Sequence, residues 1–560
     1  MSTSSGATLA GSKSPKSSAG PSALAWIVIV GVTIAIFAGI CAVRDMGYGG
    51  PHHDEVIALL ASKGFEREYA RLHDAGEAPF HKIVPASEWQ RFTRDFVSVP
   101  FSEVRDDVLF GDKHPPLAFW VLNQWLALFP HGQYEQAVVL VWIQIVVAAA
   151  LLMLAVLQHT GSRRLALLAF ATFLAGNCAV VTATWVRQYS LFTICYALTA
   201  IFAAELTRSS VSRLRMWCSA AGLGAASLLG MMIQYTFLTM SAPIHLALVV
   251  FLIQRRLTGR LAIVGTGYLF AGAAFFGLIP KAVHHALVVS QHLVRHWHVG
   301  NALWGIPQMI VPVPSILEGW IGSSLGLAVL LAVLALGARV CMYGNDAGPL
   351  NRPDPRVVLA GMLGAGILQL VMVAVGLFPG WATSPPHMCA LWWLSVLALS
   401  IWMSHQSTRL VFVLTTMALT GMIGMQCLYA WHCLRILPRV NSSYIHSQRP
   451  QLVCLDNLAR GFVLQLADVM AGDQPVLATD GASLRRRLLD GDFRQYDRVL
   501  YMPMDETVEN DKPATIEAAR KAGYTVRDLP VVHPRLYNAV LFEKQSSTAG
   551  ETVDGTAVPR

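Results

Sequence analysis

Charged residues are scarce in this chain. Only 14% of its 560 residues are Asp, Glu, Lys or Arg, whereas 54% are hydrophobic. This composition excludes an ordinary soluble enzyme and indicates a polytopic membrane protein. The formal net charge of +8 does not imply binding to nucleic acid, because in a membrane protein the positions of the basic residues matter more than their sum.

Several common motifs are also missing. The nine cysteines include no CxxC pair, and the chain has no internal repeat. Buried thiols are ordinary packing in membrane spans, and six cysteines lie in predicted spans: Cys41, Cys178, Cys195, Cys218, Cys389 and Cys427. Cys433 and Cys454 fall in the predicted outer region, where they are either free or joined by a disulfide.

Long apolar runs predict about eleven spans. They cover 23–43, 134–157, 165–184, 190–206, 216–233, 237–254, 261–280, 317–338, 357–378, 388–403 and 410–430. The first run lacks a small-residue cleavage site, so we predict a retained anchor; a removed signal peptide is the alternative. The chain is therefore predicted to be a multi-pass protein of the bacterial inner membrane.

Basic residues set the predicted orientation. With the N-terminal tail inside, every inside loop carries arginine, as the positive-inside rule requires. These residues are Arg163, Arg164, Arg208, Arg213, Arg215, Arg255, Arg256, Arg260, Arg339, Arg352, Arg356 and Arg409. The assignment keeps 115–130 out of the membrane as an interfacial helix, because counting it as a span would invert every later loop. The C-terminal region is then periplasmic.

The same pattern predicts the domain organisation. A disordered cytoplasmic tail (1–22) precedes a transmembrane domain (23–431) with periplasmic loops at 44–133 and 281–316. A small periplasmic α/β domain (432–546) and a disordered tail (547–560) follow. In this domain, strands at 474–478, 498–502, 525–528 and 537–542 alternate with helices at 482–489 and 514–522, which favours a partly parallel sheet. The first periplasmic loop is predicted to form short helices along the membrane surface.

Ionisable residues gather just after the first span. Asp54 and Glu55 follow His52 and His53 there, and a carboxylate in this place can deprotonate an acceptor hydroxyl. The alternative is an acidic pair that complements a helix N-terminus. Charged groups at a membrane edge are costly unless they are paired or wet, so we interpret the pair as part of an active site.

Three further elements lie at the same predicted surface. His114 is followed by two prolines, which fix the chain before the interfacial helix. Arg187, two residues before Tyr189, is suited to bind a phosphate bidentately; an arginine that merely extends to the membrane interface is the alternative. Gln234 and Tyr235 form an outer turn between two spans.

In this order, the four elements resemble the GT-C superfamily of polyprenyl-phosphate-dependent glycosyltransferases. The matching segments are Asp54-Glu55, His114 to Leu117, Val186 to Ser190, and Gln234-Tyr235, so the resemblance covers roughly the first 280 residues. The bacterial branch with the lipopolysaccharide galacturonosyltransferases is the most similar, and the superfamily includes the aminoarabinose transferases and protein O-mannosyltransferases. The resemblance implies a GT-C-like fold and glycosyltransferase activity.

The resemblance also implies roles for these residues. A sugar would pass, with inversion, from a polyprenyl-phosphate donor to an envelope glycan, glycolipid or protein, and Asp54, beside Glu55, would be the general base. The donor phosphate would be bound by Arg187, Lys281 and Tyr189. The substrate pocket would include His53, His114, Gln234, Tyr235 and His387. Some members use a divalent cation, for which the candidate ligands are Asp54, Glu55, His52, His53 and His114; this mixture suits zinc better than magnesium.

Two positions depart from the pattern of the branch. Val139 stands where the span often begins with arginine, and His387-Met388 stands where an Arg-Tyr pair is usual. The identity of the sugar and of the acceptor therefore does not carry over.

Other classes of protein remain as alternatives. A transporter or flippase of a lipid-linked intermediate would carry ionisable residues in the middle of its spans, whereas the polar residues there are mainly Gln144, Asn177 and Gln369. A membrane-anchored scaffold built around the C-terminal domain would not need the acidic loop.

Overall fold

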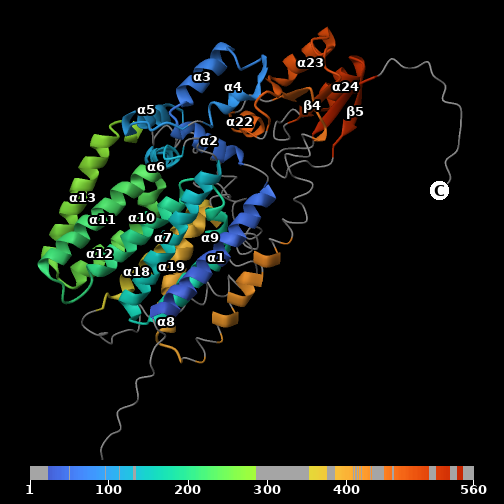
Figure 1. Ribbon diagram of the computed structural model, residues 1–560. Helices are drawn as coiled ribbons and strands as arrows, with labels where there is room; N and C mark the ends of the chain where they lie inside the picture. The colour runs from blue at the N-terminus through green and yellow to red at the C-terminus, as the bar shows by residue number, and fades with distance from the viewer. Residues whose placement is uncertain are drawn as a thin grey trace, which may run out of the picture.

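The fold is taken from a computed structural model (Figure 1). It describes residues 23–48, 51–94, 96–111, 114–129, 134–284, 352–374, 385–407, part of 409–431, 447–456, 460–468, 470–503, 512–529 and 539–545. The predicted span at 317–338, most of the second periplasmic loop and both predicted tails lie outside the described residues.

Long apolar helices form a bundle that occupies one side of the molecule (Figure 1). Its helices are α1 (Ala23–Tyr48), α7 (Tyr134–Thr160), α8 (Arg163–Ala175), α9 (Asn177–Ala183), α10 (Tyr189–Glu205), α11 (Arg213–Ile233), α12 (Thr236–Gln254), α13 (Thr258–Leu278), α18 (Pro355–Ala374) and α19 (Pro385–Met403). Among the described residues, six helices are long and apolar enough to cross a membrane, or seven if α8 and α9 count as one span. The predicted polytopic architecture is confirmed, while the count of about eleven spans stays a prediction.

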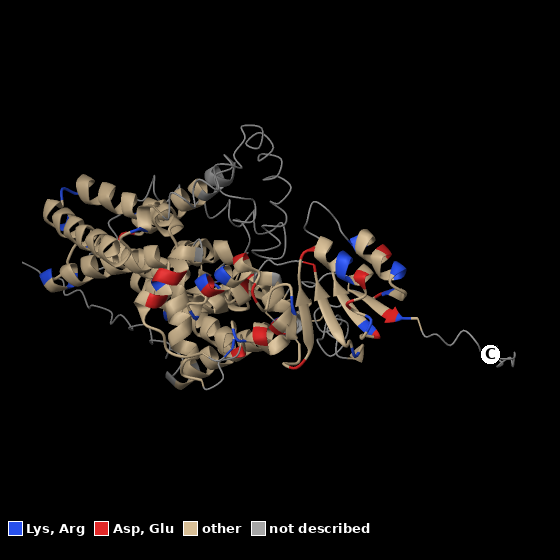
Figure 2. Cartoon of the chain, turned by 90° about the horizontal axis from the view of Figure 1, so that it is seen from above, with Lys and Arg blue, Asp and Glu red and all other residues tan. Residues whose placement is uncertain are grey.

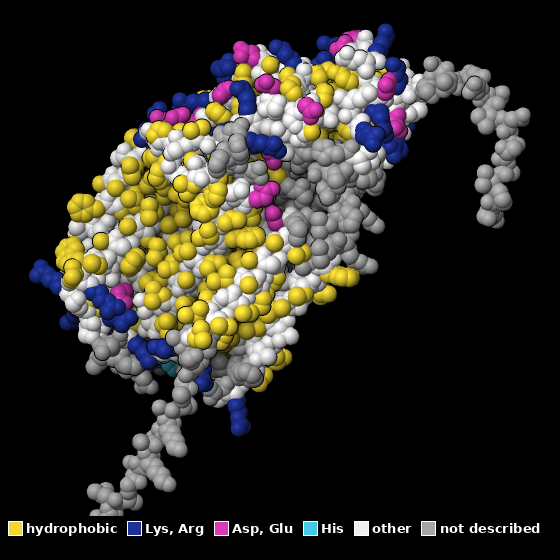
Figure 3. Space-filling view, in the orientation of Figure 1, with side chains coloured by type: hydrophobic (Ala, Val, Ile, Leu, Met, Phe, Trp, Pro, Cys, Tyr) yellow, Lys and Arg dark blue, Asp and Glu magenta, His cyan; other side chains and the backbone are white. Residues whose placement is uncertain are grey.

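Hydrophobic side chains cover the visible face of the bundle as a broad band (Figure 3). Charged side chains gather beyond its two ends. At one end Arg260 donates to the carbonyls of Leu206 and Arg208, at 2.9 and 2.5 Å, and the Asp354 N–H donates to Thr207 Oγ1 at 2.7 Å. Three of the arginine-bearing segments predicted to face the cytoplasm, which carry Arg208, Arg260 and Arg356, are therefore adjacent in space.

The third predicted span is a broken helix. α8 and α9 meet at Gly176 with a bend of 60°, where the prediction was one continuous span over 165–184. A Cβ on Gly176 would lie 2.3 Å from the indole nitrogen of Trp392, so only glycine fits here. That nitrogen donates to the Phe173 carbonyl at 3.2 Å, which also accepts the Gly176 N–H at 3.2 Å.

The first loop folds into short helices at the other end of the bundle. They are α2 (His53–Ser62), α3 (Glu66–Ala75), α4 (Ala86–Gln90), α5 (Phe101–Gly111) and α6 (Leu117–Leu126). α6, the predicted interfacial helix, has ten residues and is therefore too short to cross a bilayer, because each residue rises about 1.5 Å. α2 and α6 share an apolar core with the start of α7, which includes Ala58, Leu122 and Val138.

The C-terminal region forms an α/β unit around one six-stranded sheet. Its strands are β2 (Leu452–Leu455), β3 (Pro475–Ala478), β4 (Arg498–Met502), β5 (Tyr524–Asp528) and β6 (Val540–Lys544), and its helices are α22 (Arg460–Asp468), α23 (Gly481–Asp490) and α24 (Lys512–Lys521). β3, β2 and β4 are parallel, whereas β6 and β5 add antiparallel strands at one edge. The predicted partly parallel sheet is confirmed; β2 and α22 were not predicted.

The sixth strand comes from the first loop. β1 (Ile83–Pro85) pairs antiparallel with β3 and completes the order β1-β3-β2-β4-β6-β5. Seen from above, the strands of the sheet lie together on the side of the molecule toward the C-terminus (Figure 2). One apolar core joins the two regions, with Trp89 and Phe92 of the loop packed among residues such as Val463 and Leu500. The segment predicted as a periplasmic loop (44–133) thus contributes a strand and core residues to the unit formed by the C-terminal region, while the predicted domain boundaries stay a prediction.

Candidate active site

The predicted acidic pair lies in the first turn of α2, where the capping contacts involve the Asp54 N–H and the Glu55 carboxylate. The His52 side chain accepts from the Asp54 N–H at 3.3 Å, and Glu55 Oε2 accepts from the His52 N–H at 2.5 Å. This reciprocal pattern is a capping box, which satisfies amide groups that the helix itself leaves unpaired. The predicted alternative, an acidic pair at a helix N-terminus, is thus also true of the local structure.

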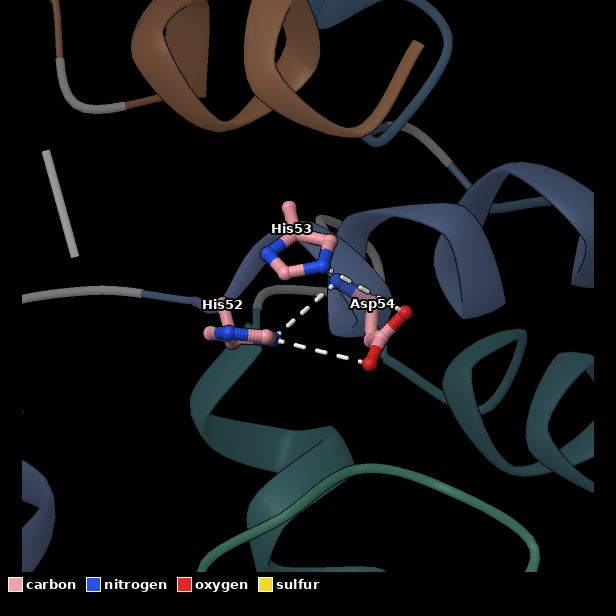
Figure 4. A group of neighbouring side chains, drawn as sticks. All are labelled: His52, His53 and Asp54. Carbon is pink, nitrogen blue, oxygen red and sulfur yellow. Dashed lines mark hydrogen bonds and ion pairs between the residues drawn. The ribbon is translucent and has the colours of Figure 1, made fainter. Parts of the chain in front are cut away.

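The two neighbouring carboxylates have opposite surroundings. Glu55 is fully buried and accepts the Val186 N–H at 2.8 Å and the Tyr134 hydroxyl at 3.0 Å. Asp54 has a side chain 33% exposed, with its oxygens 3.8 Å from Nδ1 of His52 and 3.7 Å from Nε2 of His53 (Figure 4). Among the described residues, no N–H or O–H donates a hydrogen bond to this carboxylate. Asp54 is consequently available to a substrate hydroxyl, whereas Glu55 is occupied.

Arg187 lies between Asp54 and His114. Its guanidinium donates to the Asp54 carbonyl at 3.0 Å and lies 3.1 Å from Nε2 of His114. Because arginine only donates, Nε2 accepts, and the proton of a neutral His114 ring sits on Nδ1. The three predicted elements that carry Asp54, His114 and Arg187 therefore meet in one place.

Gln188 fixes the other side of the His114 ring. Its amide lies 3.1 Å from Nδ1, and an Nδ1–H needs an oxygen partner. The two ends of an amide have the same shape, so we assign the Gln188 oxygen to this contact. The assignment also gives a donor to Oε1, which is buried and has no other partner among the described residues. His114 is thereby held with its Nε2 toward Arg187.

Tyr189 and His387 extend the cluster toward α19. The Tyr189 hydroxyl lies 2.7 Å from Nε2 of His387, and the two ring centroids are 4.3 Å apart. The charges of Arg187 and Asp54 act on the His387 ring, which places these side chains in one electrostatic neighbourhood. His387 lies in the first turn of α19 and is itself part of one of the two departures from the family pattern.

The remaining predicted residues lie farther out. Gln234 and Tyr235 connect α11 and α12, and Tyr235 packs against the apolar core of the bundle. Lys281 is exposed, and its charge helps to hold the pKa of Asp106 below its ordinary value, after the larger effect of a hydrogen bond from Arg105. Arg105 of α5 also donates to the Leu278 carbonyl at 3.3 Å, so the end of α13, just before Lys281, lies beside α5.

Three side chains of the predicted metal set fit a divalent cation. His52, His53 and Asp54 each present a ligand atom, and these atoms lie within 4.8 Å of one another. Two imidazole nitrogens and a carboxylate oxygen suit zinc and leave further positions open, although His52 would give up its contact with the Asp54 N–H. Glu55 and His114 do not fit this set, since their acceptor atoms are already hydrogen-bonded.

Two contributors were not among the predicted site residues. Tyr134, the first residue of α7, donates to Glu55, and Gln188 fixes His114. Gln188 lies inside the matched segment from Val186 to Ser190, so the motif contained it. Tyr134 follows four residues that the structure does not describe, and nothing in its local sequence marks it.

No family model matches the chain, and no curated protein matches it. Solved structures similar to it include ArnT from Cupriavidus metallidurans bound to undecaprenyl phosphate, with 13% identity and a TM-score of 0.48 over 95% of this chain and 100% of that one. They also include the archaeal oligosaccharyltransferase AglB from Archaeoglobus fulgidus in complex with an inhibitory peptide and a dolichol-phosphate, with 9% identity and a TM-score of 0.41 over 84% of this chain and 69% of that one.

An Archaeoglobus fulgidus oligosaccharyltransferase in complex with Zn and sulfate has 11% identity and a TM-score of 0.46, over 91% of this chain and 72% of that one. Because these TM-scores lie below 0.5, we base the function on the geometry of the side chains.

Proposed function

We propose that this chain is an integral membrane glycosyltransferase that moves a sugar from a polyprenyl-phosphate donor to an envelope glycan, glycolipid or protein on the periplasmic side. The observation that carries the proposal is the contrast between Asp54 and Glu55. Asp54 is partly exposed and accepts no hydrogen bond from the described residues, whereas Glu55 is buried and hydrogen-bonded. This is the arrangement expected when one acid works as a base and the other holds the structure. Arg187 adds a cation beside it.

In the proposed reaction Asp54 takes the proton of an acceptor hydroxyl. The acceptor oxygen forms a bond to the anomeric carbon while the bond from that carbon to the phosphate oxygen breaks, and its electron pair leaves with the phosphate. Attack from the opposite face inverts the configuration. Negative charge grows on the leaving phosphate, so a fixed cation aimed at it is an important contribution.

Arg187 is our candidate for that cation. Its hydrogen bonds to the Asp54 carbonyl and to His114 hold the guanidinium at the same end of α2 as the base. Tyr189 and His387 would complete the donor side. A zinc ion held by His52, His53 and one oxygen of Asp54 would supply Lewis-acid polarisation when bound, and would leave the other Asp54 oxygen to accept the proton.

Transfer assays with variants of Asp54 test the proposal. The purified protein, reconstituted in liposomes with a panel of polyprenyl-phosphate sugars, should transfer one of them to an envelope acceptor. Asp54→Asn should lower kcat by about 10²- to 10⁴-fold, the usual contribution of a general base, and leave donor binding unchanged. Asp74→Asn is the matched control, since Asp74 is 80% exposed in the same loop.

The results of these assays distinguish the proposed glycosyltransferase from the alternatives. An Asp54→Asn variant as active as the parent would remove Asp54 from the chemistry. If the parent carries the lipid-linked sugar across the bilayer without transfer, the chain is a flippase.

A further inference from the structure

The C-terminal unit touches the helix that carries the base. Gly461, in the first turn of α22, is buried against the first turn of α2. A Cβ at this position would lie 2.9 Å from the His53 Cβ, 3.1 Å from the His53 carbonyl oxygen and 3.2 Å from Cδ1 of Ile57. The distances to His53 involve its backbone oxygen and its Cβ, which cannot move without moving α2. Glycine is therefore required by close approach, and the residue approached is the neighbour of Asp54.

The opposite ends of the two helices are also tied together. Lys63, which ends α2, is buried and donates to the carbonyls of Arg91 and Arg94. Arg94 in turn donates to the carbonyl of Asp468, the last residue of α22, at 2.8 Å and pairs with its carboxylate at 3.3 Å. α2 and α22 thus lie side by side in the same direction, fixed at both ends.

A third contact closes this arrangement. Gln90 is buried and donates to the carbonyls of Ala467 and Met470, at 2.9 and 2.8 Å, and so holds the chain at the C-terminal end of α22. Between the two ends, Val56 and Leu60 of α2 share the apolar core that contains Val463. A shift of α22 cannot be absorbed in this contact, because close-packed side chains transmit displacement.

We propose that α22 is a positioning element of the active site. Its residue Gly461, by its close contact with His53, determines the position of the first turn of α2 and thereby of Asp54. This proposal rests on the proposed function. It gives the C-terminal unit a role in the chemistry of the membrane domain: it holds the base at its working distance from the donor site. Gly461 itself touches no substrate, so it acts through His53 and Asp54.

The test is a pair of glycine substitutions in the full-length protein. Gly461→Ala and Gly461→Val introduce a steric clash with His53 and Ile57 of α2. Gly472→Ala and Gly472→Val are the matched controls, because Gly472 lies in the same unit, and the nearest atoms to an added Cβ there are Gln90 Oε1 at 3.6 Å and Ser87 Cβ at 3.8 Å, ordinary contact distances. Deuterium uptake over α2, the midpoint of thermal unfolding, kcat and the KM for the lipid-linked donor are measured for each variant.

We expect Gly461→Ala to raise deuterium uptake in the first turn of α2 and to lower kcat by about 10- to 100-fold, since a misplacement of about 1 Å has this effect. The KM for the donor should change less than kcat. Gly461→Val should exceed Gly461→Ala in both respects, and the Gly472 variants should match the parent.

Three results would overturn the proposal: unchanged deuterium uptake over α2 in both Gly461 variants, an unchanged kcat, or an equal loss in the Gly472 variants, which would indicate general damage to the unit. A parent that transfers no sugar defeats the proposed function instead. The deuterium uptake would then still decide whether Gly461 positions α2.

Discussion

Asp54 and Glu55 are adjacent in the chain, yet their environments indicate different roles. Two backbone N–H groups and the Tyr134 hydroxyl point at Glu55. One of these amides belongs to Val186, which immediately precedes Arg187. Glu55 therefore joins the segment that carries the proposed base to the segment that carries the proposed phosphate ligand, and we interpret it as a positioning residue.

Glu55→Gln should destabilise the protein by about 2 kcal/mol, in the range for hydrogen bonds to a charged group. Glutamine has one acceptor oxygen, so its NH₂ would face a backbone N–H. Thermal and denaturant unfolding in detergent measure the change. Tyr134→Phe should cost less, about 1 kcal/mol of stability, because both hydrogen bonds from backbone N–H groups to Glu55 remain. Full stability of Glu55→Gln combined with lost transfer would instead make Glu55 a chemical participant.

Arg187→Lys should raise the KM for the lipid-linked donor about tenfold or more, since one charge-assisted hydrogen bond is worth about 1.5–3 kcal/mol. A lysine ammonium cannot reproduce the planar fork that reaches the Asp54 carbonyl and His114 together. Binding of the lipid phosphate alone provides a second measurement. Arg91→Lys, at an exposed ion pair with Glu68, is the control; equal donor affinity in both variants would contradict the role of Arg187.

At the scale of elements, the sequence pattern predicted those helices and strands whose formation depends on neighbouring residues in the chain. The strand predicted at 498–502 coincides with β4, and the two prolines after His114 precede α6 as expected. The break at Gly176 was missed because the indole that packs against it belongs to Trp392 of α19, more than two hundred residues later in the chain. β1 was missed because its three residues are too few to show a period.

The junction between the first loop and α22 should depend on pH. Burial raises the pKa of Asp468 above its ordinary value of 3.8, against the opposing effect of Arg94. An acid with a raised pKa in the folded state binds protons more tightly there than in the unfolded chain. Its contribution to stability is therefore present below about pH 4 and is lost as the pH rises through the folded pKa.

Comparison with Asp468→Asn isolates this effect. The measured quantity is the difference between the unfolding midpoints of the parent and of the variant. This difference should decrease as the pH is raised from about 4, where free aspartate titrates. A difference that grows with pH would mean that the ion pair with Arg94 outweighs burial.

At the scale of the whole molecule, the site depends on two regions that the hydropathy pattern keeps apart. Asp54, His114 and Arg187 could be predicted because each lies beside an apolar run. Gly461 could not, because its importance comes from the approach of a distant helix. The membrane architecture is determined by composition, whereas the joining of loop and sheet is determined by tertiary contacts.

The C-terminal unit should not fold properly alone. Residues 447–545, expressed separately, would expose the edge of β3 and the apolar face that Trp89 and Phe92 cover, and should aggregate. Fusion to residues 53–94 should restore a soluble, cooperatively folded product. The same fusion with Trp89→Ala should lose about 3–5 kcal/mol. Solubility and chemical denaturation measure these outcomes, and a well-folded isolated unit would refute the expectation.

The strand that the first loop lends to the sheet has a consequence for biosynthesis. His81, just before β1, contacts Thr479, 398 residues later in the chain. Contacts between such distant segments form late and slowly. The proposed base is therefore synthesised early, whereas α22 and β3, which support its helix, belong to the last fifth of the chain, so a product terminated before Arg460 would lack this support.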